Sequence, residues 1–304
     1  MDAEHKKEYW QRMLSNLVLL LAVSLSLFLF GGCTMAESQT EHDATQVIRI
    51  ATDYREEDLG YLQLQSFAQT VFEKSAGTMM VQLYKKDEWS TAERFVDYLN
   101  TDALEMACLP MSQAITLQPM YEIYEQPYLF SGLQAVEAYL SGSAMQKALQ
   151  HLPEAYHGVG LVADGYSYWV QGASARMMSY GAVKHLAEIH ELKNTYVYDV
   201  QAIYRLHPLV ASGTWWTTLS EQQQTWLVDS FQESIKSILI HQKEIAPKRL
   251  AESGADVYSI LPVEQAGITE QWMNQRETYF LLHSDALTAY WRPTVITIVS
   301  GKET

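Results

Sequence analysis

Two short groups of residues in this 304-residue chain have the types that enzymes use, but each lacks part of the necessary pattern. The stretch from Gly165 to Trp169 (GYSYW) resembles the nucleophile elbow of hydrolases, yet Trp169 stands where that motif needs its last glycine. His185 and His190 flank Glu188, but histidines five residues apart point to different helix faces, unlike the four-residue spacing of a zinc helix. We therefore expect a protein that is not an enzyme and that needs no metal or other cofactor.

Aromatic side chains are plentiful, with 19 tyrosines and 8 tryptophans, and several fall at predicted strand ends and loops. Such residues exclude water from a cleft while offering a few hydrogen bonds. Packing in the core and at its boundary is the alternative for each one taken singly, whereas the set together favours a small-molecule pocket. Its members are Tyr54, Trp89, Tyr166, Tyr168, Trp169, Tyr196, Tyr198, Trp215 and Trp216.

The N-terminus has the layout of an export signal. Three basic residues precede an apolar run from Leu17 to Phe30, which is shorter than the roughly 20 residues that span a bilayer. Two glycines and Cys33 follow, so the segment resembles a bacterial lipoprotein signal that is cut before Cys33, where a lipid is then attached. An uncleaved anchor or an ordinary signal peptide is the alternative. We expect an extracytoplasmic protein, lipid-anchored to a membrane through a flexible tether over residues 33–46.

Charge and cysteine content narrow the function further. The formal net charge of −15 argues against nucleic acid as a partner, because phosphates demand a basic surface. An anionic ligand would need a local cationic group. If Cys33 carries a lipid, only Cys108 remains, so no intramolecular disulfide forms. Cys108 lies in an apolar run and is expected to be an inert buried thiol.

Hydrophobic periodicity predicts an α/β fold. Residues 47–110 alternate strand, helix, strand, helix and strand, which implies parallel strand pairing, and Ser90 with Glu93 forms a capping box for the second helix. Further elements are expected along the rest of the chain: a helix over 133–152, strand–turn–strand over 158–170, a helix over 181–192, an extended segment over 195–204, the longest helix over 221–242 after Ser220, and a strand over 256–261.

Several of these stretches resemble the DctP-type solute-binding proteins of tripartite ATP-independent periplasmic (TRAP) transporters. The motifs are FAQTVFEKSAG (Phe67–Gly77) with the strand MMVQLY, LNTDALEMA (Leu99–Ala107), Pro119 followed by QPYLF (Gln126–Phe130), TYVYD (Thr195–Asp199), the helix after LSEQQQ (Leu219–Gln224), and LAESGADVY (Leu250–Tyr258). Their order matches the family over roughly residues 47–172 and 181–262.

The resemblance implies a two-lobed periplasmic-binding-protein-like fold with a long C-terminal helix. It implies capture of a small organic acid, which the membrane subunits of a TRAP transporter then carry inward on an ion gradient. The second lobe looks truncated, because roughly 50 residues of the usual α/β layout are absent after Gly172. The implied domains are a signal peptide (1–32), a tether (33–46), lobe 1 (47–157), a reduced lobe 2 with crossover strands (158–215), and a C-terminal part completing lobe 1 (216–304).

The truncation removes the strand that supplies the family's ligand-clamping arginine, and Tyr166-Ser167 replaces a second one expected just after Gly165. Arg176 is the cation left in the shortened segment; it is either the clamp or a solvated loop residue, and Lys184 is a poorer candidate since it lacks the planar fork. The predicted ligand-binding residues are Arg176, Tyr54, Trp169, Tyr198 and Asp199. The alternative function is a related lipoprotein that has lost ligand capture and acts as a structural or protein-interaction partner.

Overall fold

The computed structural model describes residues 45–89, 91–171, 175–259, 270–275 and 277–279. The predicted signal peptide, the lipidation site Cys33 and Ser90 of the predicted capping box lie outside these residues. In the described ranges, no helix combines the length and apolar character needed to cross a bilayer.

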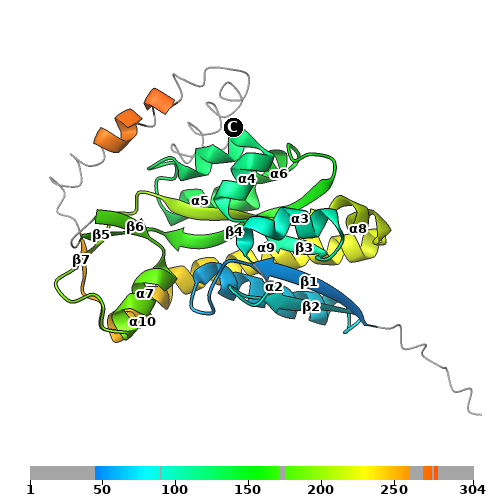
Figure 1. The fold of residues 1–304 in the computed structure, drawn as a ribbon, viewed down its shortest axis with the longest axis horizontal. Coiled ribbons are helices and arrows are strands. Elements are labelled where there is room, and N and C mark those ends of the chain that lie inside the picture. The colour runs from blue at the N-terminus through cyan, green and yellow to red at the C-terminus, as the bar shows by residue number, and fades with distance from the viewer. Residues whose placement is uncertain (1–44, 90, 172–174, 260–269, 276, 280–304) are drawn as a thin grey trace, which may run out of the picture. The chain divides into compact units, whose positions relative to one another are not determined.

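A five-stranded sheet forms the centre of lobe 1, in the order β2-β1-β3-β8-β4 (Figure 1). Strand β1 pairs in parallel with β2 and with β3, which confirms the predicted parallel pairing of residues 47–110. Strand β8 runs antiparallel to β3 and to β4. The bounds are β1 Gln46–Thr52, β2 Met79–Tyr84, β3 Met106–Cys108, β4 Tyr156–Tyr166 and β8 Tyr204–Ser212.

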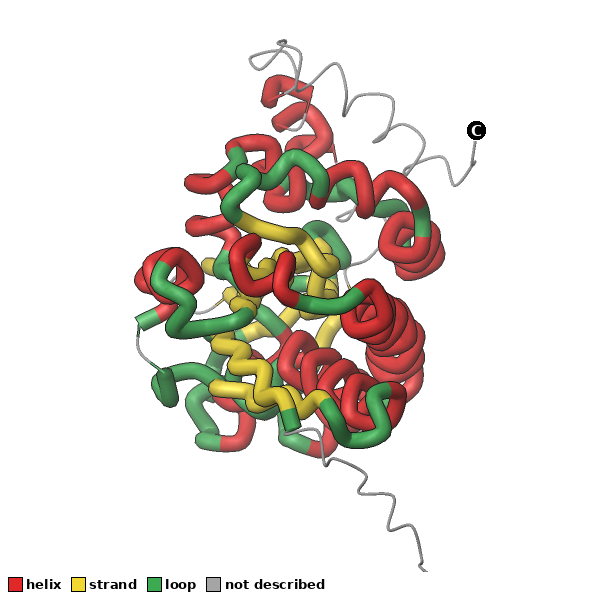
Figure 2. The backbone as a smooth tube through the Cα atoms, turned by 90° about the vertical axis from the view of Figure 1, so that its right-hand side faces the viewer, coloured by secondary structure: helices red, strands yellow, loops and turns green. Residues whose placement is uncertain are grey.

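Two long helices, α2 (Leu59–Lys74) and α9 (Glu221–Glu244), lie side by side and pack against β4 (Figures 1 and 2). Phe67 and Phe231 meet between them with ring centroids 6.0 Å apart. The long helix starts as predicted: Ser220 accepts a hydrogen bond from the Gln223 backbone, and the Gln223 side chain accepts one from the Ser220 backbone. This reciprocal cap fixes the start of the helix. The apolar face of α9 packs against α2 and β4 of lobe 1.

Shorter helices complete lobe 1. The helix predicted over 133–152 is wrong as a single element: α5 (Leu133–Ser141) ends at Gly142, whose backbone is extended, and α6 (Ser143–Leu149) begins anew. The second predicted helix is entered through a 3₁₀ turn, so it starts later than expected. The remaining elements are η1 Ala92–Arg94, α3 Phe95–Asn100, α4 Met111–Leu117, η2 Pro119–Glu125 and α8 Gly213–Thr218.

Lobe 2 is built on a small four-stranded sheet in the order β6-β5-β7-β9. Helices α7 and α10 contact each other in this lobe, and buried Val170 and Val197 sit in its sheet. The chain enters from β4 and returns through β8, so these two crossover strands join the lobes (Figure 1). The bounds are β5 Tyr168–Gln171, β6 Ala175–Met178, α7 Tyr180–Glu188, β7 Tyr196–Asp199, α10 Ala246–Glu252 and β9 Val257–Ser259.

A bulge interrupts the pairing of the crossover strands between Ala163 and Gly165. Buried glutamines from the two long helices satisfy backbone groups there: Gln63 accepts from Ala163 N at 2.7 Å, and Gln242 donates to Ala163 O at 3.5 Å. A bulge re-aims the side chain that it carries. In this fold that side chain is Asp164, which the bulge sets apart from the regular ladder.

Candidate functional site

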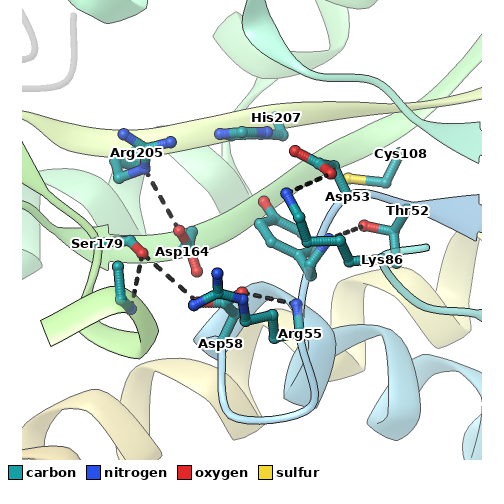
Figure 3. Close-up of a pocket in the computed structure, with 12 residues that line it drawn as sticks. Thr52, Asp53, Arg55, Asp58, Lys86, Cys108, Asp164, Ser179, Arg205 and His207 are labelled. Atoms are coloured by element: carbon teal, nitrogen blue, oxygen red, sulfur yellow. Dashed lines mark hydrogen bonds and ion pairs between the residues drawn. The ribbon is translucent and has the colours of Figure 1, made fainter. Parts of the chain in front are cut away.

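A cavity of about 190 Å³ opens where the loops after β1 and β2 meet the crossover strands and the start of α7 (Figure 3). Lobe 1, the crossover strands and lobe 2 all contribute side chains, so the cavity lies between the lobes. Its lining residues are Thr52, Asp53, Tyr54, Arg55, Asp58, Lys86, Cys108, Asp164, Ser179, Ala182, Arg205 and His207.

Tyr54 forms an aromatic part of the cavity wall. Its ring lies directly over Gly60, where an added Cβ would come within 2.3 Å of the ring, and its centroid is 5.3 Å from that of His207. The Tyr54 hydroxyl is buried and has no hydrogen-bond partner, and burial raises its pKa well above the usual value. The hydroxyl is covered and lies beside the Cys108 thiol, so Tyr54 offers the cavity its ring.

Arg205 and Asp164 form an ion pair on the paired crossover strands. Arg205 Nε lies 3.4 Å from Asp164 Oδ2, too poorly aligned for a hydrogen bond, and the Arg205 side chain keeps 34% of its surface exposed. The other Asp164 oxygen, Oδ1, accepts from Gly60 N at 3.1 Å. Burial raises the pKa of Asp164 to about 7, and Arg205 opposes that rise.

The terminal nitrogens of Arg205 make no hydrogen bond to the described residues, because the side chain contacts Asp164 through Nε. A guanidinium fork is suited to a carboxylate or phosphate, which it can bind through two parallel hydrogen bonds. Arg205 therefore presents a free anion-binding group to the cavity.

Asp58 joins the two lobes across the cavity. It lies at the N-cap position of α2, its Oδ2 accepts from Arg55 N at 2.7 Å, and Ser179 Oγ lies 3.5 Å from its Oδ1 (Figure 3). A Cβ added at Gly181 would come 1.9 Å from Asp58 Oδ1, so only glycine permits this approach to the first turn of α7. A carboxylate near a helix N-terminus is favourable, and burial is the main cause that raises the pKa of Asp58.

His207 and Cys108 contribute neutral surface to the cavity. Burial lowers the pKa of His207 to about 3, with Arg205 acting in the same direction, so the imidazole is uncharged at neutral pH. Burial raises the pKa of the Cys108 thiol, and this cysteine is free and buried, as predicted. Neither group therefore adds charge to the site.

Of the five ligand-binding residues predicted from the sequence, the structure places Tyr54 in the cavity wall. Trp169 and Tyr198 are cross-strand neighbours on β5 and β7 of lobe 2, outside the residues that line the cavity. Arg176 is exposed on edge strand β6 opposite Val170, so it points to the other face of the sheet from Trp169. Asp199 ends β7 outside the cavity, and burial raises its pKa.

Arg205 and Asp164 were not among the predicted site residues. Each interrupts an otherwise apolar strand, Asp164 in GLVADGY and Arg205 with His207 in YRLHPLV. Arg205 and His207 are two residues apart and therefore share one face of β8. Charged or polar residues that interrupt an apolar strand are the sequence signal by which they could have been found.

The enzyme-like groups do not assemble into a catalytic arrangement. Ser167 lies in the link between strands β4 and β5, whereas a nucleophile elbow joins a strand to a helix. Glu188 pairs with Lys184, and His185 lies 3.7 Å from Glu57. Across the ranges that the structure describes, no three His, Cys, Asp or Glu side chains are grouped to hold a metal ion.

Comparison with known proteins agrees with this architecture. Residues 50–194 match the model of family 7 of the bacterial extracellular solute-binding proteins, DctP. No curated protein matches the chain significantly.

Solved structures of TRAP periplasmic solute-binding proteins share the fold at low sequence identity. One from Desulfovibrio desulfuricans, with bound sn-glycerol-3-phosphate, has a TM-score of 0.68 at 14% identity, covering 84% of this chain and 99% of that one. The sugar acid binding protein DctPAm from Advenella mimigardefordensis, in complex with galactonate, has a TM-score of 0.68 at 15% identity, covering 83% and 98%. One from Sulfurospirillum deleyianum, with bound succinate, has a TM-score of 0.66 at 10% identity, covering 82% and 99%.

The two comparisons establish different things. Structural likeness at 10–15% identity establishes the fold, whereas the family model matches the sequence itself. Residues 50–194 thus match the DctP family of bacterial extracellular solute-binding proteins, and the described chain has the fold of the TRAP periplasmic solute-binding proteins.

Proposed function

We propose that this protein captures a small carboxylate-bearing solute in the cavity between its lobes and delivers it to the membrane subunits of a TRAP transporter. The observation that carries the proposal is the Arg205 guanidinium, which lines the cavity with its terminal nitrogens free. The structural neighbours hold galactonate, succinate and sn-glycerol-3-phosphate, all anions that a guanidinium fork can bind.

In this proposal Arg205 takes the clamping role that the sequence assigned to Arg176. Arg205 lies on a crossover strand and reaches the cavity, whereas Arg176 is exposed on the edge of lobe 2. Tyr54 supplies an aromatic wall. Trp169, Tyr198 and Asp199 would touch the solute only in a conformation in which lobe 2 is placed differently.

The proposal also places the protein outside the cytoplasm, held at a membrane by a lipid on Cys33 after cleavage of residues 1–32. The DctP match and the N-terminal sequence support this location. Incorporation of labelled palmitate in the producing bacterium tests it: wild type should become labelled, and a Cys33→Ser variant should not. Labelling of that variant would remove Cys33 as the anchor.

Isothermal titration calorimetry and thermal shift with the soluble domain from about residue 40 test capture. The panel contains mono- and dicarboxylates, sugar acids and amino acids. A ligand that binds only the folded state must raise the melting temperature as its concentration increases. We expect one carboxylate-bearing compound to do so, with at least tenfold weaker affinity in Arg205→Gln and unchanged affinity in the matched control Arg176→Gln.

The opposite pattern, loss in Arg176→Gln alone, would return the clamping role to Arg176. A cooperative melt that no compound shifts would favour the alternative, a fold that has lost ligand capture and binds another protein. The surface feature that favours this alternative is a pair of exposed tyrosines in lobe 2: Tyr196 is 55% and Tyr258 46% exposed, with ring centroids 6.1 Å apart.

A further inference from the structure

We infer that the cavity selects a zwitterion, a small solute with an ammonium group beside its carboxylate, such as an amino acid. The inference rests on the proposed function and narrows its solute class. The evidence is the set of buried carboxylates in the cavity beside the Arg205 guanidinium. A plain organic acid has no cationic group that could pair with these carboxylates.

The charges that line the cavity are balanced. Three cations, Arg55, Lys86 and Arg205, face three acids, Asp53, Asp58 and Asp164. Lys86 and Asp53 neutralise each other in an ion pair of 3.0 Å. A dicarboxylate in the remaining space would lie against two buried carboxylates, and like charges in a site with little water repel strongly. A ligand of both signs avoids that repulsion.

Asp164 and Asp58 both retain capacity to accept hydrogen bonds. A carboxylate offers about four acceptor positions. Asp164 receives one backbone hydrogen bond, from Gly60, and a misaligned contact from Arg205. Asp58 receives one short hydrogen bond, from Arg55 N, and a 3.5 Å contact from Ser179. Buried carboxylates need charged or hydrogen-bonding partners, so an ammonium group would complete both shells.

The ring of Tyr54 lines the same cavity as the two aspartates, while its hydroxyl is covered and lies beside the Cys108 thiol. The acceptors for an ammonium group are therefore the two carboxylates. An ammonium group has three donors and no acceptor, which suits such a pair. Arg205 meanwhile remains free to bind the carboxylate of the same molecule.

The size of the cavity supports a compact solute. Its volume of about 190 Å³ lies below the roughly 300–1,000 Å³ of pockets for drug-sized ligands. An amino acid with a small side chain fits such a space. Its ammonium and carboxylate groups are attached to the same carbon, so they can reach Asp164 and Arg205, which lie next to each other.

Matched trios of ligands test the inference by calorimetry on the soluble domain. Each trio consists of an amino acid, the same acid without its amino group, and the same amine without its carboxylate: 2-aminobutyrate, butyrate and propylamine; leucine, 4-methylpentanoate and isopentylamine. We expect the α-amino acid of at least one trio to bind ten times or more tighter than both partners. A plain acid that binds as well as its amino acid overturns the inference and leaves the proposed function intact, whereas failure of every compound overturns both.

A pair of variants then assigns the ammonium site. Asp164→Asn keeps the shape of the side chain and removes its charge, so the amino acid should bind at least tenfold more weakly while the matched plain acid binds as well or better. Asp229→Asn, on the exposed side of α9 and outside the cavity, is the control and should change neither affinity. If Asp164→Asn melts without cooperativity, Asp58→Asn replaces it. Equal losses for amino acid and plain acid would overturn the assignment.

Discussion

Nε of Arg205 lies 3.4 Å from Oδ2 of Asp164 where strands β8 and β4 pair beside the cavity. The two partners differ in their access to water: the Asp164 side chain is 2% exposed and that of Arg205 34%. The buried carboxylate therefore depends on the arginine, while the arginine can also serve a ligand. The pair therefore bears on stability and on pH response and, in the proposed function, on solute binding.

Removal of Arg205 should destabilise the fold in a pH-dependent way. Breaking a buried ion pair costs about 3–5 kcal/mol, and we expect about 1–3 kcal/mol for Arg205→Gln because Arg205 is partly solvated. Urea unfolding at pH 8 and pH 5.5 measures the loss, which should be smaller at pH 5.5, where Asp164 is protonated. In the double variant with Asp164→Asn the pH difference should vanish; a loss equal at both pH values would contradict the pairing.

Asp164 itself should make the protein less stable as pH rises. Its pKa in the folded state, about 7, lies above the ordinary 3.8, so its contribution is fully present below about pH 4 and is lost as pH rises through 7. Asp164→Asn removes this dependence. The free energy of unfolding of the variant relative to wild type should therefore increase between pH 4 and pH 7. A constant difference across that window would show that Asp164 titrates normally.

His207 should act in the opposite direction. Burial lowers its pKa from 6.5 to about 3. Between these two pH values His207 is therefore protonated in the unfolded chain and neutral in the folded protein. The contribution of His207 is present above pH 6.5 and is lost as pH falls toward 3. His207→Gln should flatten the decline in stability between pH 6.5 and pH 4, as measured by thermal unfolding.

A zwitterionic solute should release protons when it binds near pH 7. An ammonium group beside Asp164 stabilises the ionised carboxylate and lowers its pKa, whereas a plain carboxylate would raise that pKa and cause proton uptake. Arg205, Asp58 and neutral His207 share the cavity and are present in both cases. Calorimetry in buffers of different ionisation enthalpy gives the sign. Uptake of protons with the best amino acid would argue against contact with Asp164.

A side chain at Gly181 should disrupt the contact between the lobes. The Cβ of Gly181→Ala would lie 1.9 Å from Asp58 Oδ1, and overpacking of this kind costs about 1–3 kcal/mol. Thermal unfolding measures the loss. In an Asp58→Ala background the clashing carboxylate is absent, so the same glycine substitution should cost much less. If the losses in stability of the two single variants simply add in the double variant, Asp58 does not contact α7 at Gly181.

Local sequence determined the helices, strands and caps of this protein. Alternating apolar patterns over residues 47–110 sufficed for the parallel unit, and Ser220 with Gln223 marked the start of the longest helix. These elements depend on side chains a few residues apart, so their physics is visible in one stretch of chain. The burial of Cys108 and the place of Tyr54 after β1 followed from the same patterns.

Tertiary structure alone decided which charges meet. Asp164 and Arg205 are 41 positions apart and come together through antiparallel pairing and a bulge that two buried glutamines support. Arg176 lies closer in sequence to Trp169 than Arg205 does, but it points to the other face of its sheet. A one-residue change of register turns a side chain from one face to the other, and that register is set by distant contacts. The sequence alone therefore supplied the fold class, whereas tertiary structure determined which arginine lines the cavity.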